Sequence, residues 1–427
     1  MGANEPSQKS SPRVCLVTTG HPSTNPRLVK EADALTEAGY AVHVVACKLA
    51  AWADRADQQF ATRPWNVDWV HFGPMAERWR DMWLRLRRRV CREVVQLVGS
   101  RPGLAERAAH YVVPELIRAA RQRPADLYIA HNLPALPAAT RAAEQHDARL
   151  GFDAEDFHRG ELKETPENEA TLRLTRYLED TYMPHCDYLT AASDGIAEAY
   201  ADALDVPRPT TILNVFPRSE RDDESISDEA LRREKKAGTR SLYWFSQTIG
   251  PDRGLEDARD ALPLLPDDVH LYLRGEWSDG YQKAFMQRAT ELGVADRVHH
   301  LPLVPPDELI PRTARHDVGL ALEQAHTRNR NLCVTNKLFT YLLAGVPFVA
   351  TDTQGQRRIC EDLPEATRLC PAGEPAALAG AVQSLLCDEE THQAARRAAW
   401  QAGEERYNWD VERETFLSVV SNCFNEN

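Results

Sequence analysis

The sequence has 427 residues, of which 27% are charged and 43% hydrophobic, a balance typical of a globular protein with room for two domains. Its net charge of −13 excludes general nucleic-acid binding, which requires a basic surface. The nine cysteines occur singly, without a Cys-x-x-Cys pair, which argues against a zinc cluster or a disulfide framework and favours a reducing compartment.

The amino-terminal segment is polar. No apolar run in the chain approaches the roughly 20 residues of a membrane-spanning helix, and residues 1–12 lack the apolar core of a signal peptide. Myristoylation is disfavoured because Pro6 stands where that motif requires Ser or Thr. We therefore expect a disordered tail over 1–12 and a cytoplasmic protein.

Short apolar runs alternate with helical patterns through the first half of the chain. The expected strands are 14–17, 42–45, 126–130, 150–152 and 188–190. Pro26 is expected to open a helix capped by Thr24 or Asn25, and Gly39 to end it. A further helix is expected over 136–144. This alternation predicts βαβ units and a parallel sheet covered on both faces.

A charged stretch around 214–241 interrupts this alternation, which then restarts. The strands expected after it are 241–245, 269–273, 298–301, 318–322 and 348–350. The predicted fold class is α/β, with two doubly wound, Rossmann-like domains facing each other across a cleft. The expected boundaries are a first domain over 13–215, a linker over 216–240, a second domain over 241–400, and a carboxyl-terminal helix over 401–427 that returns to the first domain.

Residues 77–98 form a basic amphipathic pattern. One helical face carries Trp79, Met82, Trp83, Leu86 and Val90. The remaining positions carry the arginines Arg78, Arg85, Arg87, Arg88, Arg89 and Arg92. Such a helix is typical of a peripheral membrane contact. An ordinary helix that packs its Trp face on the domain core shows the same stripe, so both interpretations stay open.

Residues 318–352 are the most informative part of the sequence. An apolar run ends in Glu323, a polar loop follows, and Asn336-Lys337 open an amphipathic segment that stops at Gly345. A helix start offers free N–H groups and partial positive charge, so it favours an anion, and Lys337 adds a full charge. A Lys in a first turn is electrostatically disfavoured unless it meets an anion. The segment therefore predicts a site for a diphosphate-bearing ligand.

At this point the chain resembles a known family. The stretch from 18–20 (TTG) through 25–27 (NPR) to Glu31 is similar to the opening loop and helix of glycosyltransferase family 4. Further similar pieces are 130–134 (AHNLP), 153–158 (DAEDFH), 250–256 (GPDRGLE), 336–341 (NKLFTY) and 344–347 (AGVP). They follow the family's order over nearly the whole chain. The resemblance implies the GT-B fold and a retaining, nucleotide-sugar-dependent enzyme.

The resemblance assigns the donor to the second domain. Arg253 resembles the family's basic residue in the loop that contacts the diphosphate, and Lys337 is the second cation. Because enzymes of this fold stabilise the leaving diphosphate with protein cations, we expect neither a metal nor another cofactor. Glu323 is implied to lie near the hydroxyls of the donor sugar, with Asn331 and Asn336 as polar partners in the same loop.

The chain departs from the family at the ribose position. Many members carry a second Glu just inside the final helix, where it binds the ribose hydroxyls. Alignment on 344–347 (AGVP) places Thr340 there. A hydroxyl cannot chelate two ribose hydroxyls as a carboxylate does, so Thr340 is a weaker donor contact.

The first domain is implied to hold the acceptor. Gly20 follows a strand and would let a ligand approach the backbone. Arg27, near a helix start, either assists in binding that ligand or is an ordinary solvated residue. A histidine of this half contacts the transferred sugar in the family. Both His131 and His158 follow strands, and His131 is preferred. Either is otherwise a hydrogen-bonded buried histidine.

Carboxylates cluster after the strand at 150–152. They are Asp153, Glu155, Asp156 and Glu161. In an inverting enzyme one of them would be the general base for the acceptor hydroxyl. In a retaining enzyme they would orient the acceptor, and Asp156 is the one placed nearest the reaction. Of these carboxylates, Glu161 is the one that best fits an exposed loop residue without a role in the reaction.

The sequence thus predicts transfer of a hexose-like sugar from a nucleotide-diphosphate donor to a hydroxyl group. The expected acceptor is a growing polysaccharide or a lipid-linked saccharide, and 77–98 is the candidate segment for a peripheral membrane contact. Two rivals remain: a nucleotide-sugar epimerase of the same fold, and a non-catalytic scaffold, which the substitution at Thr340 favours.

Overall fold

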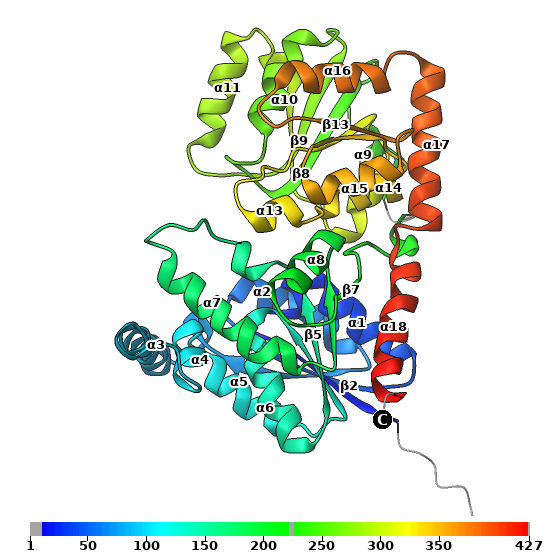
Figure 1. The fold of residues 1–427 in the computed structure, drawn as a ribbon. Helices are drawn as coiled ribbons and strands as arrows, with labels where there is room; N and C mark the ends of the chain where they lie inside the picture. Colours follow the sequence, from blue (N-terminus) through cyan, green and yellow to red (C-terminus); the bar gives the residue numbers. More distant parts are fainter. Residues whose placement is uncertain (1–10, 222–225, 426–427) are drawn as a thin grey trace, which may run out of the picture. The chain divides into compact units, whose positions relative to one another are not determined.

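Two parallel sheets form the framework of the chain, one in each of two units (Figure 1). The computed structural model describes residues 11–221 and 226–425. Unit 1 comprises the chain up to Ile212 together with the segment from Arg413, and unit 2 is Leu213–Glu412. Of the tail expected over 1–12, residues 1–10 lie outside the described residues. Among the described residues, no helix combines the length and the apolar character needed to cross a bilayer.

Unit 1 is built on a seven-stranded sheet in which all neighbours are parallel. The strands are β1 (Arg13–Thr18), β2 (Ala41–Lys48), β3 (Asn66–His71), β4 (Leu127–His131), β5 (Arg149–Ala154), β6 (Tyr188–Ala191) and β7 (Thr210–Thr211). Their order in the sheet is β3-β2-β1-β4-β5-β6-β7. All five strands expected in this half are confirmed. β3 and β7 were missed, because β3 mixes polar residues with its apolar ones and β7 has only two residues.

Helices connect these strands in turn. They are α1 (Pro26–Glu37), α2 (Ala51–Asp57), α3 (Arg78–Val98), α4 (Leu104–Ala109), α5 (Val113–Arg121), α6 (Leu136–His146), α7 (Glu169–Tyr182) and α8 (Asp194–Ala203). The side chain of Asn25 caps α1 by accepting a hydrogen bond from the N–H of Leu28 at 3.1 Å, which confirms the expected start. The last helix, α18 (Trp409–Asn425), passes from unit 2 into unit 1 at Arg413.

Unit 2 is built on a six-stranded parallel sheet of order β10-β9-β8-β11-β12-β13. Its strands are β8 (Arg240–Ile249), β9 (Val269–Trp277), β10 (Val298–Leu301), β11 (Val318–Ala321), β12 (Phe348–Thr351) and β13 (Thr367–Cys370). Its helices are α9 (Asp228–Arg232), α10 (Leu255–Ala261), α11 (Tyr281–Glu291), α12 (Leu309–Thr313), α13 (Arg328–Leu332), α14 (Asn336–Leu343), α15 (Gln354–Asp362), α16 (Pro375–Leu385) and α17 (Glu389–Glu405). The five strands expected here are confirmed, and β13 was missed.

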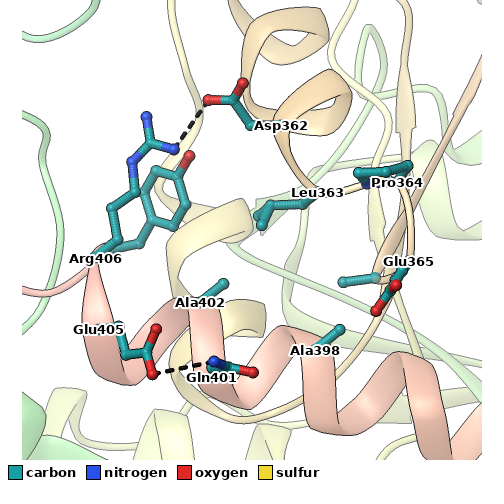
Figure 2. A pocket seen from close by; sticks show the side chains of 11 residues that line it. Asp362, Leu363, Pro364, Glu365, Ala398, Gln401, Ala402, Glu405 and Arg406 are labelled. Atoms are coloured by element: carbon teal, nitrogen blue, oxygen red, sulfur yellow. Dashed lines mark hydrogen bonds and ion pairs between the residues drawn. The ribbon is translucent and has the colours of Figure 1, made fainter.

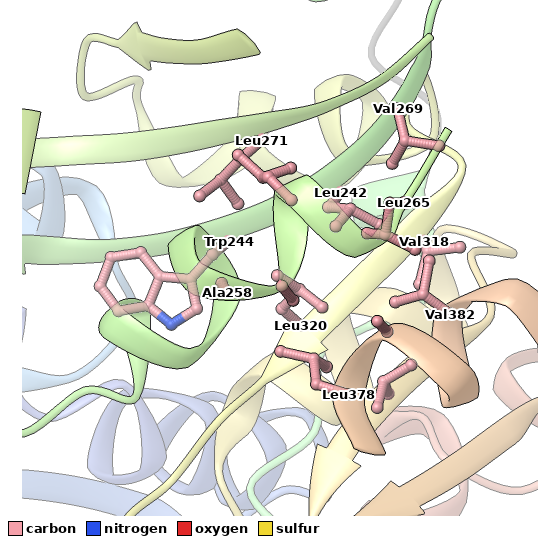
Figure 3. Packing of buried hydrophobic residues seen from close by; sticks show 14 of the residues in the cluster. Leu242, Trp244, Ala258, Leu265, Val269, Leu271, Val318, Leu320, Leu378 and Val382 are labelled. Atoms are coloured by element: carbon pink, nitrogen blue, oxygen red, sulfur yellow. The ribbon is translucent and has the colours of Figure 1, made fainter. Parts of the chain in front are cut away.

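The core of unit 2 explains why its strands read as short apolar runs. Leu242 and Trp244 of β8, Leu320 of β11, and Leu378 and Val382 of α16 belong to one buried hydrophobic cluster (Figure 3). Because helices cover both faces of the sheet, these strands are apolar on both sides. Replacing one such leucine by alanine typically costs about 2–5 kcal/mol.

The segment expected as a linker, 216–240, is structured in part. It contains a 3-10 helix (Arg218–Arg221) and α9, while 222–225 lie outside the described residues. Arg218 and Arg221 both pair with Glu404 near the end of α17, at 3.3 and 2.5 Å. The charged residues of the expected linker therefore hold part of it onto unit 2.

Candidate functional site

The sheet of unit 2 has one place where the direction of winding reverses. The chain runs outward through β8, β9 and β10, then returns to lay β11 beside β8 before continuing through β12 and β13. In open α/β sheets ligands commonly bind at such a reversal, beyond the carboxyl ends of the strands. Arg253 lies in the loop that follows β8 and Glu323 in the loop that follows β11.

Glycine fixes the loop that carries Arg253. Gly254 has φ +68°, and a Cβ atom at this position would lie 2.6 Å from the carbonyl oxygen of Leu322. Asp252 also adopts a positive φ, of 60°. The loop after β8 is thus pressed against the end of β11, next to Glu323. The need for Gly254 was missed in the sequence, although a glycine directly before a helix was its signal.

Helix α14 is anchored so that its first turn reaches the same place. The Tyr341 hydroxyl donates to the carbonyl groups of Tyr243 at 3.1 Å and Leu320 at 2.9 Å. Gly319 makes room for the Tyr341 ring, since a Cβ atom there would lie 2.5 Å from it. Lys337 lies one turn before Tyr341, and this anchoring directs it toward the end of β11.

Glu323 is the centre of a cluster of positive charge. Lys337 Nζ donates to Glu323 Oε1 at 2.8 Å, and Arg330 Nη1 donates to Oε2 at 3.3 Å. Lys337 is 9% exposed and Glu323 12% exposed as side chains. Burial alone would raise the pKa of Glu323, but the charges of Lys337, Arg330 and Arg253 hold the pKa of this carboxyl below its ordinary value. Three cations around one carboxylate leave two positive charges in excess.

Arg330 was not singled out in the sequence. It belongs to α13, a short helix capped by Thr327, whose hydroxyl accepts from the N–H of Arg330 at 3.3 Å. The segment was expected to be a loop. Its only signal was the threonine placed as a helix cap.

The three remaining donor candidates lie differently. Asn331 Oδ1 accepts from the N–H of Gln354 at 3.1 Å, so it ties the start of α15. Asn336 is exposed at the start of α14. Thr340 is fully buried, and its hydroxyl donates to the Asn336 carbonyl at 3.2 Å. The placement of Thr340 inside its own helix does not support a contact with ribose.

Unit 1 has an equivalent reversal between β1 and β4. The side chain of Asn132, directly after β4, accepts from Thr19 Oγ1 at 2.9 Å and donates to Thr18 Oγ1 at 3.0 Å. These contacts hold Asn132 at φ 68° and ψ 148°, a conformation that costs a non-glycine residue about 1–3 kcal/mol. Gly20 lies next to this clasp with an ordinary φ, and a Cβ atom there would be 3.3 Å from Thr24 Oγ1.

A buried charge cluster lies beneath this clasp. Arg27 grips Asp153 with two hydrogen bonds, each of 2.6 Å, and donates a third to the carbonyl of Ile212 at 2.5 Å. Arg27 is 1% exposed, which rules out the solvated alternative. Burial would raise the pKa of Asp153, but Arg27 and His131 hold it well below its ordinary range. Such burial does not support direct acceptor contacts by Arg27 or Asp153.

His131 lies within the same cluster and is fully buried. Its Nε2 is 3.2 Å from Glu31, and its Nδ1 is 3.5 Å from both Asp153 and Glu155. Burial alone would lower the pKa of His131, but these carboxylates raise it well above the ordinary value. The surrounding carboxylates therefore favour the protonated form of the ring.

Glu31, His131 and Asp153 also satisfy the spacing of a metal site, with ligand atoms within 4.8 Å of one another. Two features weigh against that use. Glu31 and Asp153 lie on opposite ring nitrogens of His131, and Arg27 already occupies both oxygens of Asp153. The cluster suits a proton better than a metal ion.

His158 follows β5 on the next loop, and its side chain is 11% exposed. Its Nδ1 lies 2.6 Å from Glu161 Oε1, while its Nε2 has no hydrogen-bond partner among the described residues. Burial lowers the pKa of His158, but Glu161 and the charges of Asp156 and Glu179 raise it overall. Glu161 is thus a partner of His158 rather than an isolated exposed residue. Asp156 is half-buried on the same loop.

Glu155 connects the His131 cluster to the start of α1. It accepts from Asn25 Nδ2 at 2.5 Å and lies 3.5 Å from His131. Its side chain is half-buried. Of the candidates in unit 1, the structure joins Arg27, Asp153, Glu155 and His131 in one network, and places His158 and Asp156 beside it on the following loop.

A hollow of about 380 Å³ elsewhere in unit 2 differs in kind (Figure 2). It lies between the end of α15 and α17, and none of the candidate residues lines it. Arg406 pairs with Asp362 at 3.0 Å, and Gln401 bonds Glu405 at 3.1 Å. With its one cation paired and acidic side chains at its edge, this hollow does not suit a diphosphate.

Helix α3 resolves the question left open for 77–98. Leu84, Cys91 and Val95 are its buried residues. The Trp face points to solvent instead, with Trp79 65% and Trp83 56% exposed. The interpretation that this face packs on the domain core is therefore wrong.

Comparison with known proteins agrees with this architecture. Residues 240–388 match the family described as glycosyl transferases group 1. No curated protein matches the sequence. Among solved structures, Alr3699/HepE of Anabaena, in complex with UDP and glucose, is 18% identical with a TM-score of 0.70, covering 96% of this chain and 100% of that chain.

Two further structures share the fold. Sucrose-phosphate synthase of Thermosynechococcus elongatus is 13% identical with a TM-score of 0.70, over 97% of this chain and 99% of that chain. WaaG, a glycosyltransferase involved in lipopolysaccharide biosynthesis, is 14% identical with a TM-score of 0.63, over 95% of this chain and 99% of that chain. The fold is GT-B, as the resemblance implied. With the family match, it supports a glycosyltransferase of group 1.

Proposed function

On the premise that residues 240–388 form a glycosyl transferases group 1 domain, we propose that the chain moves a hexose-like sugar from a nucleotide-diphosphate donor to a hydroxyl group, with retention. The observation that carries the proposal is the cluster of Lys337, Arg330 and Arg253 around Glu323 at the switch point of unit 2. Its excess positive charge suits a departing diphosphate. UDP, present in the Anabaena structure, is the first nucleotide to test.

The roles follow from the geometry. Arg253 and Lys337 stabilise the leaving diphosphate, and Arg330 shares Glu323 with Lys337. Glu323 accepts hydrogen bonds from Lys337 and Arg330, and as an acceptor it positions the hydroxyls of the donor sugar. In unit 1, His131 or His158 supports the reacting centre, since the ring nitrogens of His131 and the Nε2 of His158 are buried without a hydrogen-bond partner among the described residues. Neither a metal nor another cofactor is needed for these roles.

The test begins with thermal unfolding of the full chain in the presence of UDP, GDP, ADP and their sugars, since a ligand of the native state raises its stability. Turnover is then compared for Arg253→Ala and Lys337→Met. We expect each to fall about a hundredfold. Arg315→Ala and Lys283→Met remove exposed cations elsewhere in unit 2 and serve as controls. Unchanged turnover in both site variants would refute the proposal.

The acceptor is a growing polysaccharide or a lipid-linked saccharide, and α3 brings the enzyme to the membrane that carries it. Exposed Trp79 and Trp83 on a helix with seven arginines and two acidic residues fit an anionic lipid surface. Trp79→Ser with Trp83→Ser should abolish flotation with anionic vesicles. Trp52→Ser, which removes another exposed tryptophan of unit 1, should not. Flotation that is insensitive to salt and to the Trp79 and Trp83 changes argues against this contact.

A further inference from the structure

A hollow of about 590 Å³ lies in unit 1 among α4, α5 and α6. Its lining includes four arginines, Arg107, Arg118, Arg121 and Arg141, and one carboxylate, Glu106. None of these residues belongs to the sites described above. A concave surface that concentrates guanidinium groups is suited to an oxyanion, because each guanidinium can present two parallel N–H donors to it.

Half of this positive charge is not neutralised by a carboxylate. Arg107 donates to the carbonyl of Gly103, and Arg121 donates to the carbonyl of Arg141 at 3.2 Å. A carbonyl orients a guanidinium without cancelling its charge. Arg118 has no ion-pair partner within 11–221 and 226–425, and Arg141 pairs with Glu144 at 2.9 Å.

The single carboxylate in the lining does not balance the arginines. Glu106 is buried and accepts a hydrogen bond from the Tyr182 hydroxyl through Oε1. Its Oε2 has no hydrogen-bond partner among the described residues. With Glu106 and Glu144 counted against the four arginines, two positive charges remain. A phosphate monoester carries about −1.5 to −2 charges near neutral pH, which matches this excess.

The hollow belongs to the most basic part of the chain. Residues 78–121 contain eleven arginines and four acidic residues in a protein of net charge −13. Arg87 of α3 pairs with Glu115 of α5 at 2.7 Å, and Arg88 donates to the carbonyl of Ala108 in α4 at 3.3 Å. These contacts join the helices of the hollow to the helix with the exposed Trp face.

We propose that the hollow among α4, α5 and α6 binds a phosphate monoester, carried either on a lipid headgroup or on a soluble molecule. Arg118 and Arg121, both exposed on α5, are the principal contacts, with Arg107 and Arg141 completing the ring of charge. The proposal is independent of sugar transfer. It extends the membrane contact of α3 by naming the chemical class that the neighbouring helices recognise.

The test uses the full chain and the double variant Arg118→Gln, Arg121→Gln. Its matched control is Arg55→Gln, Arg173→Gln, which removes two exposed arginines from the same unit. Flotation compares vesicles containing phosphatidic acid, a monoester, with vesicles containing phosphatidylglycerol, a diester. Thermal unfolding with inorganic phosphate tests the soluble source.

Loss of binding to phosphatidic acid vesicles by about tenfold or more in the α5 variant, but not in the control, supports the lipid source. Loss of stabilisation by inorganic phosphate in the α5 variant alone supports a soluble phosphate ester. The proposal is overturned if both variants behave alike in both measurements. Turnover in solution is expected to be unchanged in the α5 variant, so failure here is distinct from failure of the proposed sugar transfer.

Discussion

Gly254 lies against the end of β11 so closely that a Cβ atom would be 2.6 Å from the carbonyl oxygen of Leu322. This approach connects the loop of Arg253 to the residue before Glu323. The positive φ of Gly254, +68°, lets the chain turn directly into α10. Two loops that are far apart in sequence thereby bring their charges to one place.

We expect Gly254→Ala to disturb this arrangement more than strain alone would. The added methyl group meets backbone at a positive φ, so the free energy of unfolding should fall by about 2–3 kcal/mol. Gly280→Ala is the control, because Gly280 has a similar φ of +75° and a methyl group added there would have no atom within 4 Å. It should cost only about 1 kcal/mol. Equal costs, measured by denaturant unfolding, would show that the approach to Leu322 is unimportant.

Glu323→Gln tests whether the cluster is built for an anion. Removing one negative charge from among Lys337, Arg330 and Arg253 should tighten binding of inorganic pyrophosphate several-fold, while turnover falls because the sugar loses its carboxylate contact. Titration calorimetry measures the first effect and a transfer assay the second. Glu276→Gln, an exposed change on β9, should alter neither. Weaker pyrophosphate binding in Glu323→Gln would contradict the charge argument.

Two arginine–aspartate pairs in unit 1 should differ widely in how much stability is lost when the arginine is replaced. Arg27→Met leaves Asp153 buried without its partner, which should destabilise the unit by about 3–5 kcal/mol. Arg13→Met breaks the pair with Asp126, whose side chains are 52% and 42% exposed, and should cost at most about 1 kcal/mol. Hydrogen exchange of the β1 and β5 peptides reports on unit 1 alone. Comparable losses of protection in both variants would contradict the burial of Arg27.

Two histidines should give unit 1 opposite pH dependences. Carboxylates raise the pKa of His131 well above its ordinary value, so its contribution to stability is complete below about pH 6.5 and is lost as the pH rises through the folded-state pKa. Burial lowers the pKa of His110 to about 4. Its contribution is complete above about pH 6.5 and is lost as the pH falls toward 4.

The variants His131→Gln and His110→Phe separate these contributions. The first should flatten the alkaline limb of the stability profile, and the second the acid limb. Unfolding measured across the pH range checks both. An alkaline limb that persists in His131→Gln would show that His131 is not the imidazolium of the cluster.

Much of the fold could be read from local patterns. Every expected strand was found, because a parallel strand covered on both faces is a short apolar run that stands out from amphipathic helices. The three missed strands, β3, β7 and β13, each lie at an edge of a sheet. β3 and β13 contain polar residues, and β7 has only two residues. The start of α14 at Asn336 was also predicted, from the pattern that places a polar residue before an apolar stripe.

Side-chain partners were much harder to predict. Lys337 was expected to meet an anion, and the anion in the structure is Glu323, fourteen positions earlier. Arg27 and Asp153 were placed on the acceptor side, yet they satisfy each other over a separation of 126 residues. The burial of Thr340 was equally hidden, since helix position alone does not say which face packs inward.

The sequence by itself determined the alternation of strands and helices, the family resemblance, and the loops in which Arg253, Glu323, Lys337 and His158 lie. These depend on local periodicity and on residue types near strand ends. Only the tertiary structure decided that Arg253 approaches Glu323, that His131 is enclosed, that the Trp face of α3 is exposed, and that four arginines gather among α4, α5 and α6. The order of strands in each sheet and the packing of helices on it set these outcomes, because they bring together residues that no local pattern relates.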